Sequence, residues 1–237
     1  MSIPFEELIK PVGMENFLTK YKGKRHFVIK SDKPKFNKHF SWEEFDNYLN
    51  QVNIGEWDRT PQLQVVLPNN GKWCKKKSPE KKSREEIYKL WKSGSSFIPT
   101  ISEFLNKTLW KQCQEFEKFY GIGQANIYCS NQKDAMCFPI HADSTDNFLF
   151  HVSGKIRWYM YKEFSENNQH FRPQDATLEE VFELDEGDLL YIPRGKYHRV
   201  DTLSQEYQLV FTFMSHQLME VEEIGMTGSR RREVWQT

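Results

Sequence analysis

A mainly β protein with α additions is the fold class that the sequence predicts. From residue 124 onward, short apolar runs follow one another at a spacing of roughly 8–12 residues, with turn residues between them. Aromatic residues make up 15% of the 237-residue chain, which suits strands that pack against one another. Apolar residues at helical spacing lie before residue 121. Together these patterns predict a β-sandwich or barrel preceded by a mixed α/β N-terminal region.

The N-terminal region is expected to alternate helices and strands. Ser41 is a suitable N-cap for an amphipathic helix within residues 41–52. A later helix, within residues 100–121, is expected to be capped by Thr100 or Ser102 and to end near Gly121. The other elements predicted here are short helices within 5–25, strands at 26–29 and 63–68, and a helix within 83–94.

The barrel strands are predicted from the apolar runs after residue 121. They are expected at 124–130, 138–143, 147–153, 155–161, 181–184, 188–193, 198–203 and 207–214. We therefore expect one structural domain. In it, residues 1–120 pack on the barrel, residues 121–216 form the barrel, and residues 217–237 form a C-terminal tail.

Charge and cysteine content argue against several classes of protein. Lys plus Arg and Asp plus Glu both number 33, so the whole-chain charge does not suggest a nucleic-acid binder. The lysine-rich residues 69–86 predict a solvated loop, and a contact with an acidic partner such as tRNA is the open alternative. No basic leader or membrane-length apolar run is visible, which predicts a cytoplasmic protein. Cys74, Cys113, Cys129 and Cys137 lack CxxC spacing, which argues against a zinc knuckle or a disulfide scaffold.

A histidine and an aspartate one residue apart stand out in the run at 137–143, "CFPIHAD". Residues i and i+2 of a strand share a face, so His141 and Asp143 are expected to project together. His198 opens a later predicted strand, after "EGDLLYIPRGKY". Two histidines and one carboxylate form the facial triad typical of non-haem Fe(II), with zinc as the second choice of metal. For a single histidine the simpler interpretation is a side chain satisfied by its neighbour. For Cys137 it is a small apolar wall residue.

The runs "IHADSTDNFLFHVSGKIRWYMY" and "LDEGDLLYIPRGKYHRV" resemble the JmjC-type, cupin-fold Fe(II)/2-oxoglutarate oxygenases. The nearest branch is that of ribosomal oxygenases and asparaginyl hydroxylases, with the tRNA wybutosine hydroxylase nearby, and the resemblance covers most of residues 5–214. It implies a double-stranded β-helix, the cupin or jelly-roll barrel. It further implies Fe(II) held by the catalytic residues His141, Asp143 and His198, and 2-oxoglutarate and O2 as co-substrates. Asn147 matches an asparagine that in several members touches 2-oxoglutarate or shapes its pocket, while His151 and Tyr128 are either pocket-lining or packed core residues.

The sequence departs from this family at the residue that grips the distal carboxylate of 2-oxoglutarate. Members typically place a lysine or arginine two residues after the glycine turn, and here that position is Ile156. A bulge that shifts the register by one would turn Lys155 or Arg157 inward. Alternatively another strand supplies the anchor, or 2-oxoglutarate is not used in the usual way. The candidates on other strands are His151, Tyr128, Gln208 and Thr212.

The function implied is an Fe(II)- and 2-oxoglutarate-dependent hydroxylase of a side chain in a protein or peptide, which releases succinate and CO2. The alternatives are a metal-binding cupin that acts as a regulatory module, and an oxygenase that modifies tRNA or a natural product. A homodimer is also left open. Arg194 and Lys196 are expected at the barrel rim, either in a solvated loop or facing an acidic substrate group.

Overall fold

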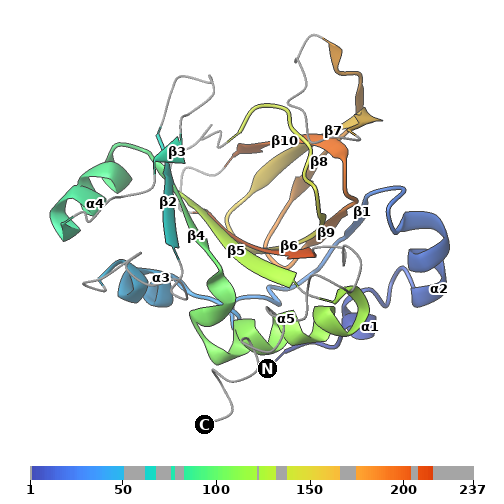
Figure 1. Ribbon diagram of the computed structural model, residues 1–237, viewed down its shortest axis with the longest axis horizontal. Helices are drawn as coiled ribbons and strands as arrows, with labels where there is room; N and C mark the ends of the chain where they lie inside the picture. Colours follow the sequence, from blue (N-terminus) through green and yellow to red (C-terminus); the bar gives the residue numbers. More distant parts are fainter. Residues whose placement is uncertain are drawn as a thin grey trace, which may run out of the picture.

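Two antiparallel sheets form the centre of the molecule (Figure 1). The computed structural model describes residues 2–50, 62–67, 76–77, 83–121, 123–131, 138–165, 175–203 and 208–215. The larger sheet has the strand order β1-β9-β6-β11-β5-β4-β2-β3, and the smaller has the order β10-β7-β8. The strands are β1 (Phe27–Ile29), β2 (Gln62–Val66), β3 (Lys76–Lys77), β4 (Ser96–Thr100), β5 (Gly123–Ser130), β6 (Asp146–Ser153), β7 (Ile156–Phe164), β8 (Leu178–Leu184), β9 (Leu189–Ile192), β10 (Lys196–Thr202) and β11 (Gln208–Ser215).

The smaller sheet faces part of the larger one and closes a jelly-roll barrel with it (Figure 1). One apolar cluster joins residues of both sheets, with Leu149, Leu190, Ile192 and Val210 from the larger and Ile156, Trp158, Met160 and Leu184 from the smaller. Shared burial of this kind is how two sheets form a common interior. The mainly β class with α additions and the cupin barrel are therefore confirmed. Strands β1, β2 and β4, from the first 120 residues, extend the larger sheet.

Helices cover the outer side of the larger sheet (Figure 1). Ser41 and Ser83 each form a capping box, with Glu44 and Glu86 respectively. The long helix near the sheet begins later than predicted, because Thr100 ends β4 and Asn106 is the N-cap, whose side chain accepts from the backbone N–H of Leu109. The helices are α1 (Phe5–Leu8), α2 (Met14–Asn16), the π-helix η1 (Phe17–Tyr21), α3 (Trp42–Leu49), α4 (Arg84–Lys92), the 3-10 turn η2 (Ser102–Phe104) and α5 (Lys107–Tyr120).

The segment expected as a strand at 138–143 has no regular strand geometry. Its only ladder contact among the described residues is an isolated antiparallel bridge between His141 and His198. The other predicted barrel strands correspond to β5 to β11, with shifted ends. Residues 217–237, Cys74, Cys137 and most of the lysine-rich stretch lie outside the described residues. Within the described part, no helix has both the length and the apolar character needed to cross a membrane.

Candidate metal centre

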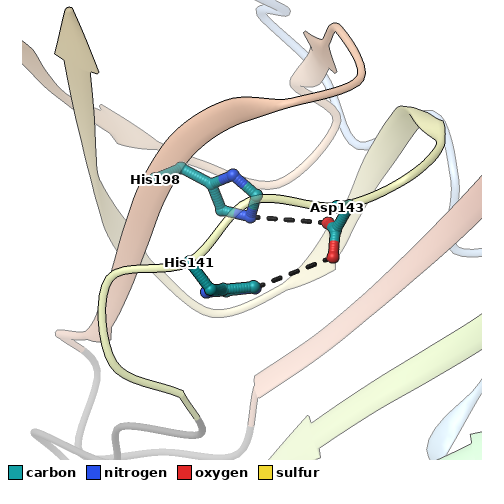
Figure 2. Close-up of side chains that lie close together, drawn as sticks. All are labelled: His141, Asp143 and His198. Carbon is teal, nitrogen blue, oxygen red and sulfur yellow. Dashed lines mark ion pairs between the residues drawn. The ribbon is translucent and has the colours of Figure 1, made fainter. Parts of the chain in front are cut away.

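Three side chains converge at one end of the barrel: His141, Asp143 and His198 (Figure 2). One ligand atom of each lies within 4.8 Å of the others. The Nε2 atom of His141 is 3.9 Å from Oδ1 of Asp143, and the Nε2 atom of His198 is 3.6 Å from Oδ2 of the same carboxylate. The carboxylate therefore faces the same nitrogen on both rings, which leaves a common point for a cation between them.

The backbone around these residues fixes where the side chains project. His141 and His198 exchange both backbone hydrogen bonds, at 3.1 and 2.9 Å, and this pair sets the two rings side by side with centroids 4.4 Å apart. The N–H of Gly195 donates to the carbonyl of Asp143 at 2.8 Å. Gly195 has φ +79°, and a Cβ there would lie 2.6 Å from the Ser165 carbonyl oxygen, so the "PRG" corner requires glycine.

Both imidazole rings are oriented by their second nitrogen. Nδ1 of His141 lies 2.9 Å from the carbonyl oxygen of Pro139, and Nδ1 of His198 lies 2.9 Å from that of Lys196. A carbonyl can only accept, so each Nδ1 is the donor of its bond, and Nε2 is the nitrogen of each ring that faces Asp143 and is available to a metal. A backbone carbonyl behind the ring is the usual way in which a metal-binding histidine is held.

The carboxylate of Asp143 is also held from behind. The side-chain amide of Asn147 donates to its Oδ2 at 2.5 Å. The hydroxyl of Thr145 donates to Oδ1 of Asn147 at 2.9 Å, which fixes which end of the amide faces Asp143. The sequence indicates a role for Asn147 but not for Thr145. The only signal for Thr145 was its spacing, two residues from Asp143 and two from Asn147.

These ligand atoms suit a divalent cation of hard or borderline character that has further coordination positions open. Two neutral imidazoles and one carboxylate are the ligands of the facial triad, which suits Fe(II). The side chain of His198 is only 4% exposed, that of His141 18% and that of Asp143 36%, so the centre opens to the outside on the aspartate side. Phe138 lies beside His141 and Trp158 beside His198, with ring centroids 5.3 and 5.6 Å away. Each histidine ring of the centre therefore has an aromatic neighbour.

The residues proposed to contact 2-oxoglutarate are not all placed near the metal ligands. Asn147 adjoins Asp143, as described. Tyr128 on β5 packs against the apolar interior of the barrel. His151 is fully buried farther along β6, where its Nε2 lies 2.8 Å from the carbonyl of Gly154, and burial lowers its pKa. The side chains of Gln208 and Thr212 lie outside what the structure describes.

Lys155 and Arg157 lie on the outer face of the barrel, which corrects the expectation that a bulge turns one of them inward. Lys155 pairs with Glu183 at 3.0 Å, and Arg157 pairs with the same carboxylate at 2.6 Å. The physical reason is the register of β7, which pairs Ile156 with Leu184 and Arg157 with Glu183 without a shift at these positions. Ile156 therefore faces inward, as strict alternation requires.

The rim residues also differ from expectation in one case. Arg194 is exposed, but Lys196 is buried, and its ammonium donates to Glu179 at 2.5 Å. The same ammonium lies 4.6 Å from the centroid of the Phe164 ring. Lys196 thus ties β10 to the hairpin of β7 and β8 rather than standing in a solvated loop. The pairing is invisible in the sequence because Glu179 is 17 residues away.

Comparisons with known proteins agree with this architecture. The model of a family described as the JmjC domain matches residues 100–221. The bifunctional lysine-specific demethylase and histidyl-hydroxylase NO66 of Dictyostelium discoideum is 27% identical over 220 residues, which are 88% of this chain and 42% of the relative. Ribosomal oxygenase 1 of Danio rerio is 27% identical over 224 residues, 90% of this chain and 40% of the relative. The chain thus spans less than half the length of these curated relatives.

Solved structures share the fold. The Escherichia coli ribosomal oxygenase YcfD superposes with a TM-score of 0.63 at 18% identity, covering 90% of this chain and 53% of that chain. A structure of YcfD in complex with cobalt and 2-oxoglutarate gives a TM-score of 0.61, also at 18% identity, and covers 86% and 52% of the two chains. At this level of identity the likeness establishes the barrel architecture and nothing finer.

Proposed function

The chain belongs to the JmjC domain family, and from this premise we propose that it is a non-haem Fe(II)- and 2-oxoglutarate-dependent oxygenase. The observation that carries the proposal is the convergence of His141, Asp143 and His198, with both Nε2 atoms turned toward one carboxylate. The YcfD structure with cobalt and 2-oxoglutarate supports the same pairing of metal and co-substrate on this fold. Residues 121–216 would form the catalytic barrel, and residues 1–120 its supporting region.

His141, Asp143 and His198 would hold the iron. When bound there, Fe(II) supplies the activation of O2 that is coupled to oxidation of 2-oxoglutarate to succinate and CO2. The chain itself supplies orientation and exclusion of water. Asn147 holds the carboxylate of Asp143 in place and adjoins the positions that a co-substrate would take. Trp158 buries one side of the His198 ring, and Phe138 lies against the His141 ring. Tyr128 would line the co-substrate site, while His151 would close the far end of the barrel.

The proposed substrate is a side chain of a protein or peptide, which the enzyme would hydroxylate. Support comes from the names of the relatives, which refer to lysine demethylation, histidyl hydroxylation and ribosomal oxygenation. We also propose a cytoplasmic location. Cys113 and Cys129, the cysteines that the structure describes, are buried thiols rather than a disulfide, as is usual in a reducing compartment.

An anaerobic titration tests the proposal. Purified protein is titrated with Fe(II) with and without 2-oxoglutarate, and the visible charge-transfer band between iron and the 2-oxo acid is followed. We expect the band in the wild-type protein and its loss in His198→Ala, with His39→Ala as a matched control because His39 is buried away from the centre. Iron binding without a band for any 2-oxo acid would contradict the oxygenase.

The second candidate is a metal-binding cupin without oxygenase turnover, favoured by the apolar side chain at position 156. A second readout separates the two. The iron-loaded protein is incubated with O2, 2-oxoglutarate and peptides from ribosomal proteins, and mass spectrometry looks for the gain of one oxygen atom. An iron-dependent gain supports the oxygenase, and succinate formed without any modified peptide would point to another substrate class.

A further inference from the structure

The barrel interior beyond the metal centre is apolar along β7. Ile156 is 1% exposed and lies in one cluster with residues from both sheets. Its neighbours across the strands are Leu184 on β8 and Thr202 on β10. The His198–Met160 pair, the Val200–Trp158 pair and the Thr202–Ile156 pair follow one another along β10 and β7. A molecule that is bound to the metal and extends along β7 would therefore pass Met160 and Trp158 before it reaches Ile156.

The cationic side chains that the structure describes near this wall are engaged elsewhere. Lys155 and Arg157 point outward and share Glu183. Lys30, at the end of β1, pairs with the buried carboxylate of Asp188 and lies 3.6 Å from that of Asp185. Lys196, at the metal end, pairs with Glu179. Each charge is thus already neutralised by a carboxylate, and none of these side chains joins the apolar cluster around Ile156.

Two buried polar atoms that face the barrel interior have no hydrogen-bond partner among the described residues: Nε1 of Trp158 on β7 and Nδ1 of His151 on β6. Burial lowers the pKa of the His151 ring, so it does not supply a ready cation. Nε1 of Trp158 is buried without a hydrogen-bond acceptor among the described residues. A buried donor that lacks a partner is unusual and suits an acceptor atom of a ligand. It is, however, a single neutral N–H, which brings no positive charge to balance that of a buried carboxylate.

The apolar surroundings of Ile156 should favour some ligands over others according to the group at the end distal to the metal, here called the tail. Burying a carboxylate next to Ile156 and Leu184 without a cation carries a large desolvation penalty. An alkyl tail in the same place gains from burial instead. A neutral polar tail needs only one donor, and Trp158 provides one.

Resting on the proposed function, we propose that this barrel accepts 2-oxo acids with an uncharged tail at least as readily as 2-oxoglutarate, and that Ile156 sets this preference. The class of co-substrate is then the 2-oxo acids whose end distal to the keto group is aliphatic or neutral polar. Their shared 2-oxo carboxylate head would bind the metal, so the proposed centre is unchanged.

Binding of three acids to the Fe(II)-loaded protein under anaerobic conditions tests the preference. They are 2-oxoglutarate, 5-methyl-2-oxohexanoate, in which an isopropyl group replaces the distal carboxylate, and the 5-methyl ester of 2-oxoglutarate, which keeps the distal carbonyl without the charge. The apparent Kd of each is read from the charge-transfer band and, independently, from quenching of tryptophan fluorescence. We expect both neutral acids to bind as tightly as 2-oxoglutarate or more tightly.

Variants at position 156 assign the preference to one side chain. Ile156→Lys is expected to favour 2-oxoglutarate over the isopropyl acid by about tenfold or more relative to wild type. Ile156→Val, the matched apolar control, is expected to leave the ratio unchanged within about twofold. The wild-type ratio decides the question even if the lysine variant does not fold.

The outcomes separate this proposal from the proposed function. If wild-type protein binds 2-oxoglutarate more than about tenfold tighter than both neutral acids, the preference is wrong and the oxygenase stands. If iron binds but none of the three acids produces a band, the proposed function fails and the preference fails with it.

Discussion

The two faces of the larger sheet are built from different side chains, and β6 shows the contrast in a single strand. Phe148, Phe150 and Val152 point to the helices and join an extensive cluster rich in phenylalanine. Asn147, Leu149 and His151 alternate with them and face the barrel, where Leu149 joins the smaller, mostly aliphatic cluster. The helix side of the larger sheet therefore holds the phenylalanine-rich cluster, and the barrel side holds the polar groups that orient a metal ligand.

This contrast separates stability from chemistry within one element. Neighbouring residues of a strand point to opposite faces of the sheet. A substitution on one face therefore leaves the side chains on the other face unchanged. Burial of many aromatic rings on the helix side supplies the apolar contacts that hold the sheet. A barrel wall supported in this way can keep a buried polar atom without a partner among the described residues, such as Nδ1 of His151 on β6. Variants on the two faces are therefore expected to fail in different assays.

The largest expected effect is on the helix side, at Phe116 of α5. Its ring is fully buried and contacts Phe5, Phe148, Phe150 and Phe213. Phe116→Ala removes a large side chain from a packed core, and we expect a loss of about 3–5 kcal/mol in the free energy of unfolding. Denaturant unfolding measures it. The exposed Phe119 of the same helix is the control, because Phe119→Ala should cost far less.

Iron affinity sharpens the same comparison, since Phe116→Ala protein that remains folded should bind Fe(II) like wild type. A large loss of iron affinity in that variant would show that the two faces are coupled.

An intermediate effect is expected on the barrel side, at Asn147. Without the amide that donates to Asp143, the carboxylate loses the contact that holds its orientation. Asn147→Ala should therefore weaken Fe(II) binding by about 10–100-fold, the usual range for a residue behind a metal ligand. Isothermal titration calorimetry under anaerobic conditions measures it. Asn126→Ala is the matched control, because that buried asparagine bonds Gln124 and the backbone of Ile101 instead.

Unchanged iron affinity in Asn147→Ala would show that the bonds of the two histidine rings to Pro139 and Lys196 are sufficient to organise the centre.

The sequence was sufficient to predict the barrel, most of its strands and the convergence of His141, Asp143 and His198. The strands depend on local alternation, and the convergence of the three residues depends on motif spacing; a single sequence contains both. It was insufficient where a tertiary partner decides the outcome. The segment at 138–143 does not form a strand, and it pairs with β10 only through the backbone bridge between His141 and His198. Lys196 is buried because its ammonium pairs with Glu179. Thr100 belongs to β4, so α5 begins later and Asn106 is its N-cap.

The outward orientation of Lys155 and Arg157 was one of two competing predictions from the sequence. Alternation alone predicted it, and the competing idea of a bulge rested on the expectation that a cation must face inward. The register of β7 against β8 decides for alternation, because Arg157 and Glu183 are directly opposite each other on the outer face. A local rule was reliable here, and the expectation based on resemblance was not.

The smallest expected effect compares one buried histidine from each side. His39 packs against Phe36 and Phe150 on the helix side, and His151 lies at the far end of the barrel wall. Burial lowers the pKa of both rings. The bond to Gln112 partly opposes this at His39, and the carbonyl of Gly154 and nearby carboxylates oppose it at His151. In the unfolded chain each histidine regains a pKa of about 6.5, so below that pH the unfolded state binds more protons than the folded state.

The free energy of unfolding should therefore fall as the pH drops from about 7.5 to about 5.5. His39→Gln and His151→Gln should each flatten this dependence, and denaturant unfolding across that range measures the slope. Because several carboxylates stabilise a charged His151 and a neutral amide faces His39, we expect the larger flattening from His39→Gln. Equal flattening would mean that the carboxylates near His151 do not offset its burial more than Gln112 offsets that of His39. A slope unchanged in both variants would show that other groups control the acid response.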